Sequence, residues 1–155
     1  MDKLGEHIKA PVRLLRQQVG YKDFTDGGGA VGTLSLNLKL PAGALVLGWG
    51  VNVLEAFTAD TTAVLIVGDT STNDSLSENT DDVSVYTTGI KTSQSPLNCD
   101  DINANITPGY GSTAPTVKLT ITGQSDWGNV VAGKLEIVVA YLDMHPGYNS
   151  LITRK

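Results

Sequence analysis

The stretch TLSLNLKL (Thr33–Leu40) alternates polar residues with leucine along its whole length. This period of two is typical of a β-strand that buries one face and exposes the other. A turn sequence, PAGA (Pro41–Ala44), follows, and LVLGWGVNVLEAF (Leu45–Phe57) then resumes the alternation. In this second stretch Gly48 and Gly50 share the non-apolar face, where they allow a bend or the close approach of a neighbouring backbone. The pattern predicts two long strands joined by a turn.

The rest of the chain carries the same pattern in shorter pieces. Ala63–Gly68 is a short apolar run, and Val83–Gly89, Thr116–Gly123 and Gly133–Met144 alternate apolar and polar residues. Ile102–Thr107 gives a weaker signal of the same kind. No helical period stands out in this region, and turn residues recur at short intervals. We therefore expect about seven strands and an all-β fold, either an antiparallel β-sandwich or a barrel.

Composition agrees with one β-rich domain. The chain has 155 residues, the size of one ordinary domain, and 41% of them are apolar. Charged residues make up 17%, against about 25% in an average protein, and Gly, Ser, Thr and Asn take their place. Val and Thr favour strands, while Gly, Asn and Ser favour turns.

The first 32 residues differ from the rest in charge and pattern. Residues 1–22 hold five basic and two acidic residues, whereas residues 23–133 hold three basic and twelve acidic ones. Pro11 interrupts any helix near the start, and TDGGGAVG (Thr25–Gly32) has the composition of a flexible linker. We therefore expect residues 1–32 to form an N-terminal arm with a Gly-rich hinge, extended or partly helical, and residues 33–155 to form the sandwich. The acidic body argues against nucleic-acid binding, and the basic arm suits an acidic partner.

The polar stretch GDTSTNDSLSENTDD (Gly68–Asp82) is the first candidate for chemistry. It lacks the lysine and the following helix of a phosphate-binding P-loop. Counted from Asp69, its first, third and fifth residues match ligand positions of an EF-hand calcium loop, but Asp74 stands where that loop needs glycine and Thr80 where it needs glutamate. A solvated turn, in which Asp69 and Asn73 bond nearby amides, is the interpretation that fits best.

Side chains suited to catalysis are few and scattered. Cys99 is the single cysteine, so we expect neither an internal disulfide nor a zinc knuckle. His7 lies in the arm and His145 near the C-terminus, so neither is held by a strand against a nucleophile. The pairs Asp81–Asp82 and Asp100–Asp101 are adjacent residues, whose side chains diverge on a strand and cannot face each other as glycosidase carboxylates do. We expect no enzyme activity, no metal and no cofactor.

The hydropathy of the chain points away from membranes. No apolar run reaches the roughly 20 residues that a membrane span needs. Charges and Pro11 interrupt the first sixteen residues, so no secretory signal sequence is expected there. We expect a soluble protein, made in a cytoplasm, with no membrane partner.

The order of these pieces resembles that of a known family. A basic arm and a Gly-rich hinge precede the first alternating strand, and four short motifs follow it: LPAGALVLG (Leu40–Gly48), VNVLEAF (Val51–Phe57), VLIVGD (Val64–Asp69) and GKLEIVVAYL (Gly133–Leu142). Over Thr33–Tyr141 the chain resembles the head decoration (cement) proteins of tailed bacteriophages, which are small all-β virion proteins. In similar proteins the VGD motif continues with Asp, Pro, Arg and an aromatic residue, whereas here it continues TSTNDSL.

The resemblance implies a jelly-roll or related β-sandwich on the capsid exterior, often as a homotrimer, that clamps neighbouring major capsid subunits. It implies a non-enzymatic virion protein, made in the host cytoplasm, that reinforces the assembled capsid. The arm would then supply the capsid contacts, because exposed apolar and basic side chains need a partner surface. These contacts are expected from Leu4, Ile8, Val12, Arg13, Leu14, Leu15, Arg16, Tyr21 and Phe24.

Aromatic residues suggest an alternative function. Trp49 has the strand pattern and is expected in the core, whereas Trp127, in the loop QSDWGN, is expected to be exposed. Together with Tyr110, Trp127 is a candidate for a ligand or subunit contact. The alternative is therefore a receptor- or glycan-binding module of a phage tail or head fibre.

Overall fold

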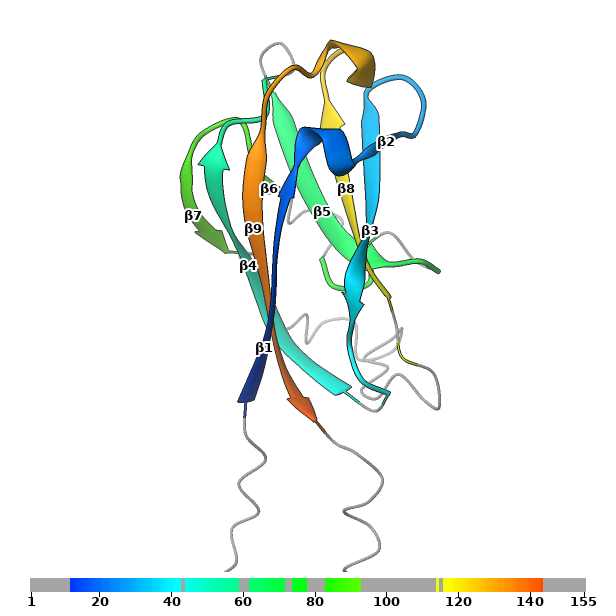
Figure 1. Ribbon diagram of the computed structural model, residues 1–155, viewed down its shortest axis with the longest axis vertical. Coiled ribbons are helices and arrows are strands. Elements are labelled where there is room, and N and C mark those ends of the chain that lie inside the picture. The colour runs from blue at the N-terminus through cyan, green and yellow to red at the C-terminus, as the bar shows by residue number, and fades with distance from the viewer. Residues whose placement is uncertain are drawn as a thin grey trace, which may run out of the picture.

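The computed structural model describes residues 12–42, 44–58, 62–71, 74–77, 83–92, 114 and 116–143. These residues form two antiparallel sheets that pack as a sandwich, which confirms the predicted all-β class (Figure 1). The four-stranded sheet has the order β1-β9-β4-β7, and the five-stranded sheet has the order β2-β3-β8-β5-β6. The elements are β1 (Val12–Gly20), η1 (Tyr21–Asp23, a 3-10 turn), β2 (Thr25–Asp26), β3 (Val31–Lys39), β4 (Ala44–Glu55), β5 (Ala63–Asp69), β6 (Val83–Ser84), β7 (Gly89–Thr92), β8 (Thr116–Gly123), η3 (Trp127–Asn129, a 3-10 turn) and β9 (Lys134–Asp143).

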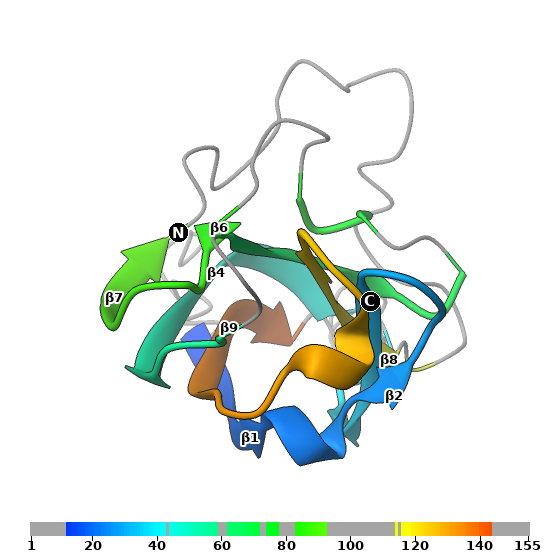
Figure 2. The same cartoon turned by 90° about the horizontal axis from the view of Figure 1, so that it is seen from above.

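Strand pairing is nested along the chain. β1 pairs with β9, β3 with β8, β4 with β7 and β5 with β6, all antiparallel. The chain therefore folds as one long hairpin whose two arms wind together across both sheets, which is the jelly-roll arrangement. Figure 2, which looks at the sandwich from above, shows the two sheets facing each other.

The core lies between the sheets and follows the alternation of the sequence. Trp49, Val51 and Val53 of β4 are buried, as expected from their shared face. On the facing sheet the buried residues include Leu65 of β5 and Leu119 of β8. The strands predicted at 33–40, 45–57, 63–68, 116–123 and 133–144 are thus confirmed to within two residues at each end.

The apolar face predicted for Thr33–Leu40 is interrupted by a change of register in β3. Leu36 and Leu40 are buried, but Leu38 between them is 48% exposed. The pairing of β3 with β8 shifts between Ser35 and Lys39, so strict alternation does not continue through this stretch.

The strand predicted at 83–89 is two short strands in different sheets. β6 ends at Ser84 and pairs with β5, whereas β7 starts at Gly89 and pairs with β4. Residues 85–88 cross from one sheet to the other between them, and Gly89 takes a positive φ of 117° at the start of β7. The weaker strand predicted at 102–107 lies outside the described residues.

The N-terminal segment is built into the sandwich from residue 12 onward. β1 pairs with β9 at nine consecutive positions, from Val12 opposite Leu142 to Gly20 opposite Lys134. This corrects the predicted arm of residues 1–32 and its boundary at residue 33, because the described residues 12–32 are part of the fold. The physical reason is that β9 would otherwise be an edge strand with an open ladder. Residues 1–11 lie outside the described residues.

The predicted Gly-rich hinge is an ordered turn between β2 and β3. The Asp26 carboxylate accepts a hydrogen bond from the Gly28 N–H at 2.8 Å, and the Gly27 N–H donates to the Val31 carbonyl at 2.7 Å. The turn is tied to the other arm of the long hairpin, since the Trp127 N–H donates to the Gly29 carbonyl at 2.6 Å. Such a turn holds the two strands in register and does not act as a flexible linker.

An aromatic cluster closes this end of the sandwich. Phe24 lies edge-on to Phe57 with ring centroids 5.8 Å apart, and its ring centroid is 5.5 Å from that of Trp127. All three side chains are buried. Phe57 sits against Gly133, where an added Cβ would come within 2.5 Å of the ring. The N-terminal segment therefore supplies part of the core through Phe24.

Candidate binding surface

The outer face of the four-stranded sheet is a candidate binding surface in the described part of the chain. Strand register places side chains of four strands in rows across it. One row is Arg16, Val138, Gly50 and Thr92, and the next is Gln18, Glu136, Asn52 and Ile90. The alternate residues of the same strands, such as Leu15, Ile137 and Val51, are buried in the core.

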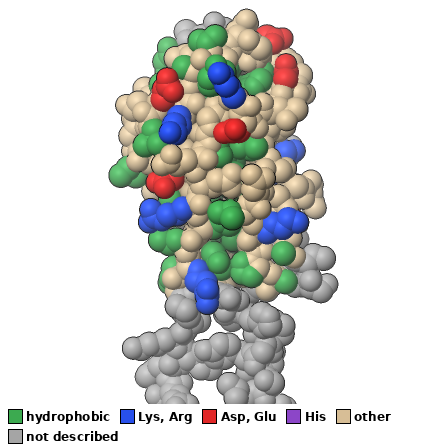
Figure 3. All heavy atoms as spheres, in the orientation of Figure 1, with side chains coloured by type: hydrophobic (Ala, Val, Ile, Leu, Met, Phe, Trp, Pro, Cys, Tyr) green, Lys and Arg blue, Asp and Glu red, His purple; other side chains and the backbone are tan. Residues whose placement is uncertain are grey.

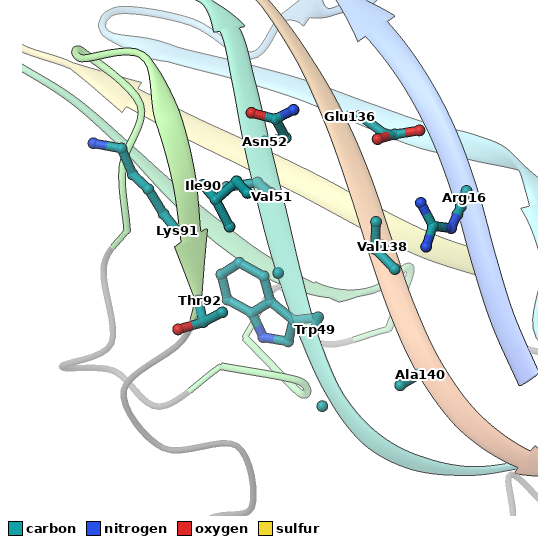
Figure 4. Close-up of a pocket in the computed structure, with 12 residues that line it drawn as sticks. Arg16, Trp49, Val51, Asn52, Ile90, Lys91, Thr92, Glu136, Val138 and Ala140 are labelled. Atoms are coloured by element: carbon teal, nitrogen blue, oxygen red, sulfur yellow. The ribbon is translucent and has the colours of Figure 1, made fainter. Parts of the chain in front are cut away.

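A recess of about 660 Å³ lies on this face (Figure 4). Its lining includes Gly48, Gly50 and Ala140. Because the glycines have no side chain and alanine has only a methyl group, the surface of the sheet is hollow at this point. Gly50 also permits the close approach of β7 that the sequence suggested, because an added Cβ would lie 3.2 Å from the Lys91 carbonyl. In Figure 4, Arg16 and Glu136 stand on the two neighbouring strands at one side of the recess, and Lys91 extends away from the rest.

Exposed apolar side chains gather on the same sheet. The described residues include seven large hydrophobic residues that are exposed, and four of them belong to this sheet: Val12, Leu14, Leu54 and Ile90. Ile90 is 83% exposed, and Val12 and Leu14 on β1 are 58% and 50% exposed. By strand register Val12 and Leu14 lie toward one end of this sheet and Ile90 toward the other, with the recess between them. Exposed apolar side chains edged by polar residues are typical of a protein-interaction surface.

Charge is unevenly distributed on the face seen in Figure 3. Asp and Glu side chains lie in the upper and middle parts of the described surface, where Lys and Arg side chains also occur, whereas its lower part shows Lys, Arg and hydrophobic side chains without Asp or Glu. β1 begins in this lower part and contributes Arg13 and Arg16. The lower part is therefore suited to a partner that brings acidic and apolar groups.

The predicted capsid-contact residues fall into three groups. Leu15 and Phe24 are each 7% exposed and belong to the core, where no partner reaches them, and Tyr21 packs against that core while half-buried. Val12, Arg13, Leu14 and Arg16 are exposed residues of β1. Leu4 and Ile8 lie outside the described residues.

The residues predicted for ligand or subunit contact are not brought together. Trp127 is 6% exposed, so the expectation that it is exposed is wrong. Its indole lies over Gly32, whose missing side chain leaves the space that the ring occupies. Tyr110 lies outside the described residues.

Trp49 is buried, as predicted, and it also anchors the polar loop that follows β5. Its indole N–H donates to the Leu76 carbonyl at 2.6 Å. In that loop Asp69 accepts hydrogen bonds from the Ser71 N–H at 2.6 Å and the Ser75 hydroxyl at 3.1 Å, which confirms its predicted role in bonding local groups. The Ser77 hydroxyl accepts from the Val67 N–H at 3.0 Å, so the loop folds back on its own strand.

The side chains that the sequence analysis considered for catalysis fall outside the described residues. Among them no three His, Cys, Asp or Glu side chains are grouped as a metal site. His7, His145, Cys99 and the acidic pairs Asp81–Asp82 and Asp100–Asp101 lie outside the described residues. No helix in the described ranges is long and apolar enough to span a bilayer.

Two apolar residues of this surface, Ile90 and Val138, were not predicted from the sequence. Ile90 lies on β7, which was not predicted, and Val138 lies in the strand Gly133–Met144 on the face opposite the predicted inward residues. Apolar residues on both faces of that strand were a signal that its outer face is also apolar. Gly48 and Gly50 were a second signal of an unusual surface.

Comparisons with known proteins add one weak structural similarity. Neither a protein-family model nor a curated protein sequence matches the chain. A chain of a solved structure described as "Cyanophage Pam1 capsid asymmetric unit" is similar with a TM-score of 0.46 and 18% sequence identity, over 84% of this chain and 84% of that chain. A similarity of this size carries no argument about function.

Proposed function

We propose that this protein is a non-enzymatic virion structural protein that binds the outer surface of an assembled capsid and reinforces contacts between major capsid subunits. In this proposal it is made in the host cytoplasm and acts as a homotrimer. The observation that carries it is the outer face of the four-stranded sheet, where exposed Val12 and Leu14 of β1 lie near Arg16, and exposed Ile90 of β7 lies across the recess. The family resemblance of the sequence motifs suggests which kind of partner covers this face.

The physical logic of such a function does not require a tight single site. An oligomer that touches several capsid subunits gains affinity from linked contacts, each of which is weak alone. Because it binds the assembled lattice and not free subunits, binding stabilises the shell by mass action. A shallow apolar face with a few charges is sufficient for this purpose.

The described contact residues of the proposal are Val12, Leu14 and Arg16, with Arg13 beside them. Val12 and Leu14 are half-exposed or more, so a partner that covers them removes apolar surface from water. Arg16 lines the recess of the same face. Leu15 and Phe24 are excluded from the contact set because they hold the core together.

The test is the copy number in purified particles, measured by quantitative mass spectrometry against the major capsid protein. We expect a copy number comparable to that of the major capsid protein, because a protein that reinforces the lattice must occupy its repeating sites. A handful of copies per particle would instead place the protein at a vertex, neck or tail and would contradict the proposal.

The alternative function, a receptor- or glycan-binding module, is not supported by the position of its main candidate residue. It relied on an exposed Trp127, which is buried against Gly32 and Phe24. A Trp127→Ala variant would therefore unfold the end of the sandwich and could not report on a binding site. No other observation in the described residues favours this alternative.

A further inference from the structure

The edges of the two sheets differ in how well they are protected. In the described residues, β2 and β6 at the edges of the five-stranded sheet have two residues each, and β7 has four. β1 has nine residues in unbroken register with β9. Edge strands present unpaired backbone groups, and proteins protect them by shortness, proline, bulges or charge. Of these devices β1 has only its two arginines.

The direction of the backbone groups along β1 follows from a contact just beyond it. The Tyr21 N–H donates to the Gly133 carbonyl at 2.9 Å, which continues the ladder between β1 and β9. Bonded positions alternate in an antiparallel pair, so the odd-numbered residues of β1 face β9. The even-numbered residues direct their N–H and C=O groups to the open side; these are Val12, Leu14, Arg16 and Gln18.

Nothing in the described part of the chain pairs with this open side. No backbone hydrogen bond outside the ladder engages those four residues there. At the far end, the Gly20 N–H donates to the Asp23 carboxylate at 2.7 Å. The side chain of Asp23 thus closes the edge at Gly20, and the accessible edge runs from Val12 to Gln18.

The charge of β1 favours a different protein over a second copy of this chain as the partner that pairs with this edge. Two β1 strands side by side would bring together four arginines and no carboxylate, since β1 holds Arg13 and Arg16 and no acidic residue. Like charges on paired strands are destabilising, whereas opposite charges stabilise. A strand that carries carboxylates is the better fit.

We propose that β1 accepts an extended segment of an acidic partner protein, which adds one strand to the four-stranded sheet. The inference rests on the proposed function, in which this partner belongs to the capsid. Backbone groups of Val12, Leu14, Arg16 and Gln18 supply the hydrogen bonds, as in other cases of strand addition. On the outer face, apolar side chains of the added strand lie beside Val12 and Leu14, and a carboxylate lies opposite Arg16.

The backbone contribution is tested by Leu14→Pro, with Leu14→Ala as the matched control. Proline removes an outward N–H that the β9 ladder does not use, and edge strands tolerate it there. The probe is a capsid shell that lacks this protein, with binding measured by co-sedimentation and folding checked by thermal melting followed by circular dichroism. We expect Leu14→Pro to bind about tenfold more weakly than Leu14→Ala, because a partner carbonyl is left unpaired.

The charge contribution is tested by Arg16→Glu against Arg16→Gln. We expect Arg16→Glu to bind more weakly than Arg16→Gln, because only the first places a carboxylate opposite the partner's carboxylate. Equal binding of Leu14→Pro and Leu14→Ala would overturn strand addition, and equal binding of the two Arg16 variants would overturn the acidic partner. In both cases wild-type binding would still support the proposed function, whereas a wild-type protein that does not bind shells would overturn both.

Discussion

Trp127 owes its burial to a glycine. The indole lies directly over Gly32 on β3, in a position that any side chain at residue 32 would occupy. The ring also contacts Phe24, so one residue from each end of the chain covers the same end of the core. A tryptophan in a polar loop was expected to be exposed, and only its neighbours across the sandwich show why it is not.

We predict that Gly32→Ala lowers the free energy of unfolding by about 1–3 kcal/mol, because the methyl group would displace the indole from a filled site. Gly20→Ala is the matched control, since its added Cβ would lie 3.7 Å from the nearest atom, at ordinary contact distance. Urea denaturation of both variants measures the difference. Equal losses of stability would show that the contact with Trp127 is not the cause.

At the scale of elements, β1 is the strand that the sequence pattern concealed. Its inward residues include Leu15 and Val19, but Gln17 lies between them and interrupts the apolar alternation. Val12 and Leu14 point outward and place apolar residues on the face where a half-buried strand usually has polar ones. The sequence of β1 therefore shows scattered apolar residues in a basic segment, although the strand pairs with β9 along its whole length.

We predict that a chain lacking residues 1–24 does not fold cooperatively, whereas a chain lacking residues 1–11 does. The longer deletion removes Leu15, Val19 and Phe24 from the core, each worth about 1.5–3 kcal/mol of burial. Together with the lost β9 ladder this approaches the total stability of an ordinary domain, about 5–15 kcal/mol. Thermal unfolding followed by circular dichroism distinguishes the two. A cooperative transition in the longer deletion would show that β1 is dispensable, as expected of an arm.

At the scale of the whole molecule, nested pairing makes the sandwich one cooperative unit. β1 near the start of the chain pairs with β9 near its end, and β3 pairs with β8, so each sheet combines strands from the two halves of the chain. The Trp49 indole on β4 is hydrogen-bonded to the loop after β5, whereas Trp127 packs against Phe24 at the end of the sandwich beside η1. The two tryptophans therefore report on separate parts of one core.

We predict that Trp49→Phe and Trp127→Phe variants each unfold in a single transition. In each variant the fluorescence of the remaining tryptophan should give the same urea midpoint as far-UV circular dichroism, because coincident probes are the mark of two-state unfolding. Separate midpoints in either variant would indicate that one end of the sandwich opens independently.

Local pattern was sufficient for the all-β class and for β3, β4, β5, β8 and β9, because alternation with period two depends only on neighbouring residues. Trp49, Val51 and Val53 were placed in the core on that basis alone, and their burial confirms it. The same reasoning placed Asp69 in a turn that bonds its own loop.

Tertiary structure alone decided which segments meet. The role of β1 as an edge strand, the burial of Trp127 and the division of residues 83–92 between two sheets all depend on partners distant in the chain. The candidate surface is of the same kind, because it is assembled from Arg16, Gly50, Ile90 and Val138 on four different strands. No local pattern contains that information, since side-chain periodicity states which face of a strand is buried but not which strand lies beside it.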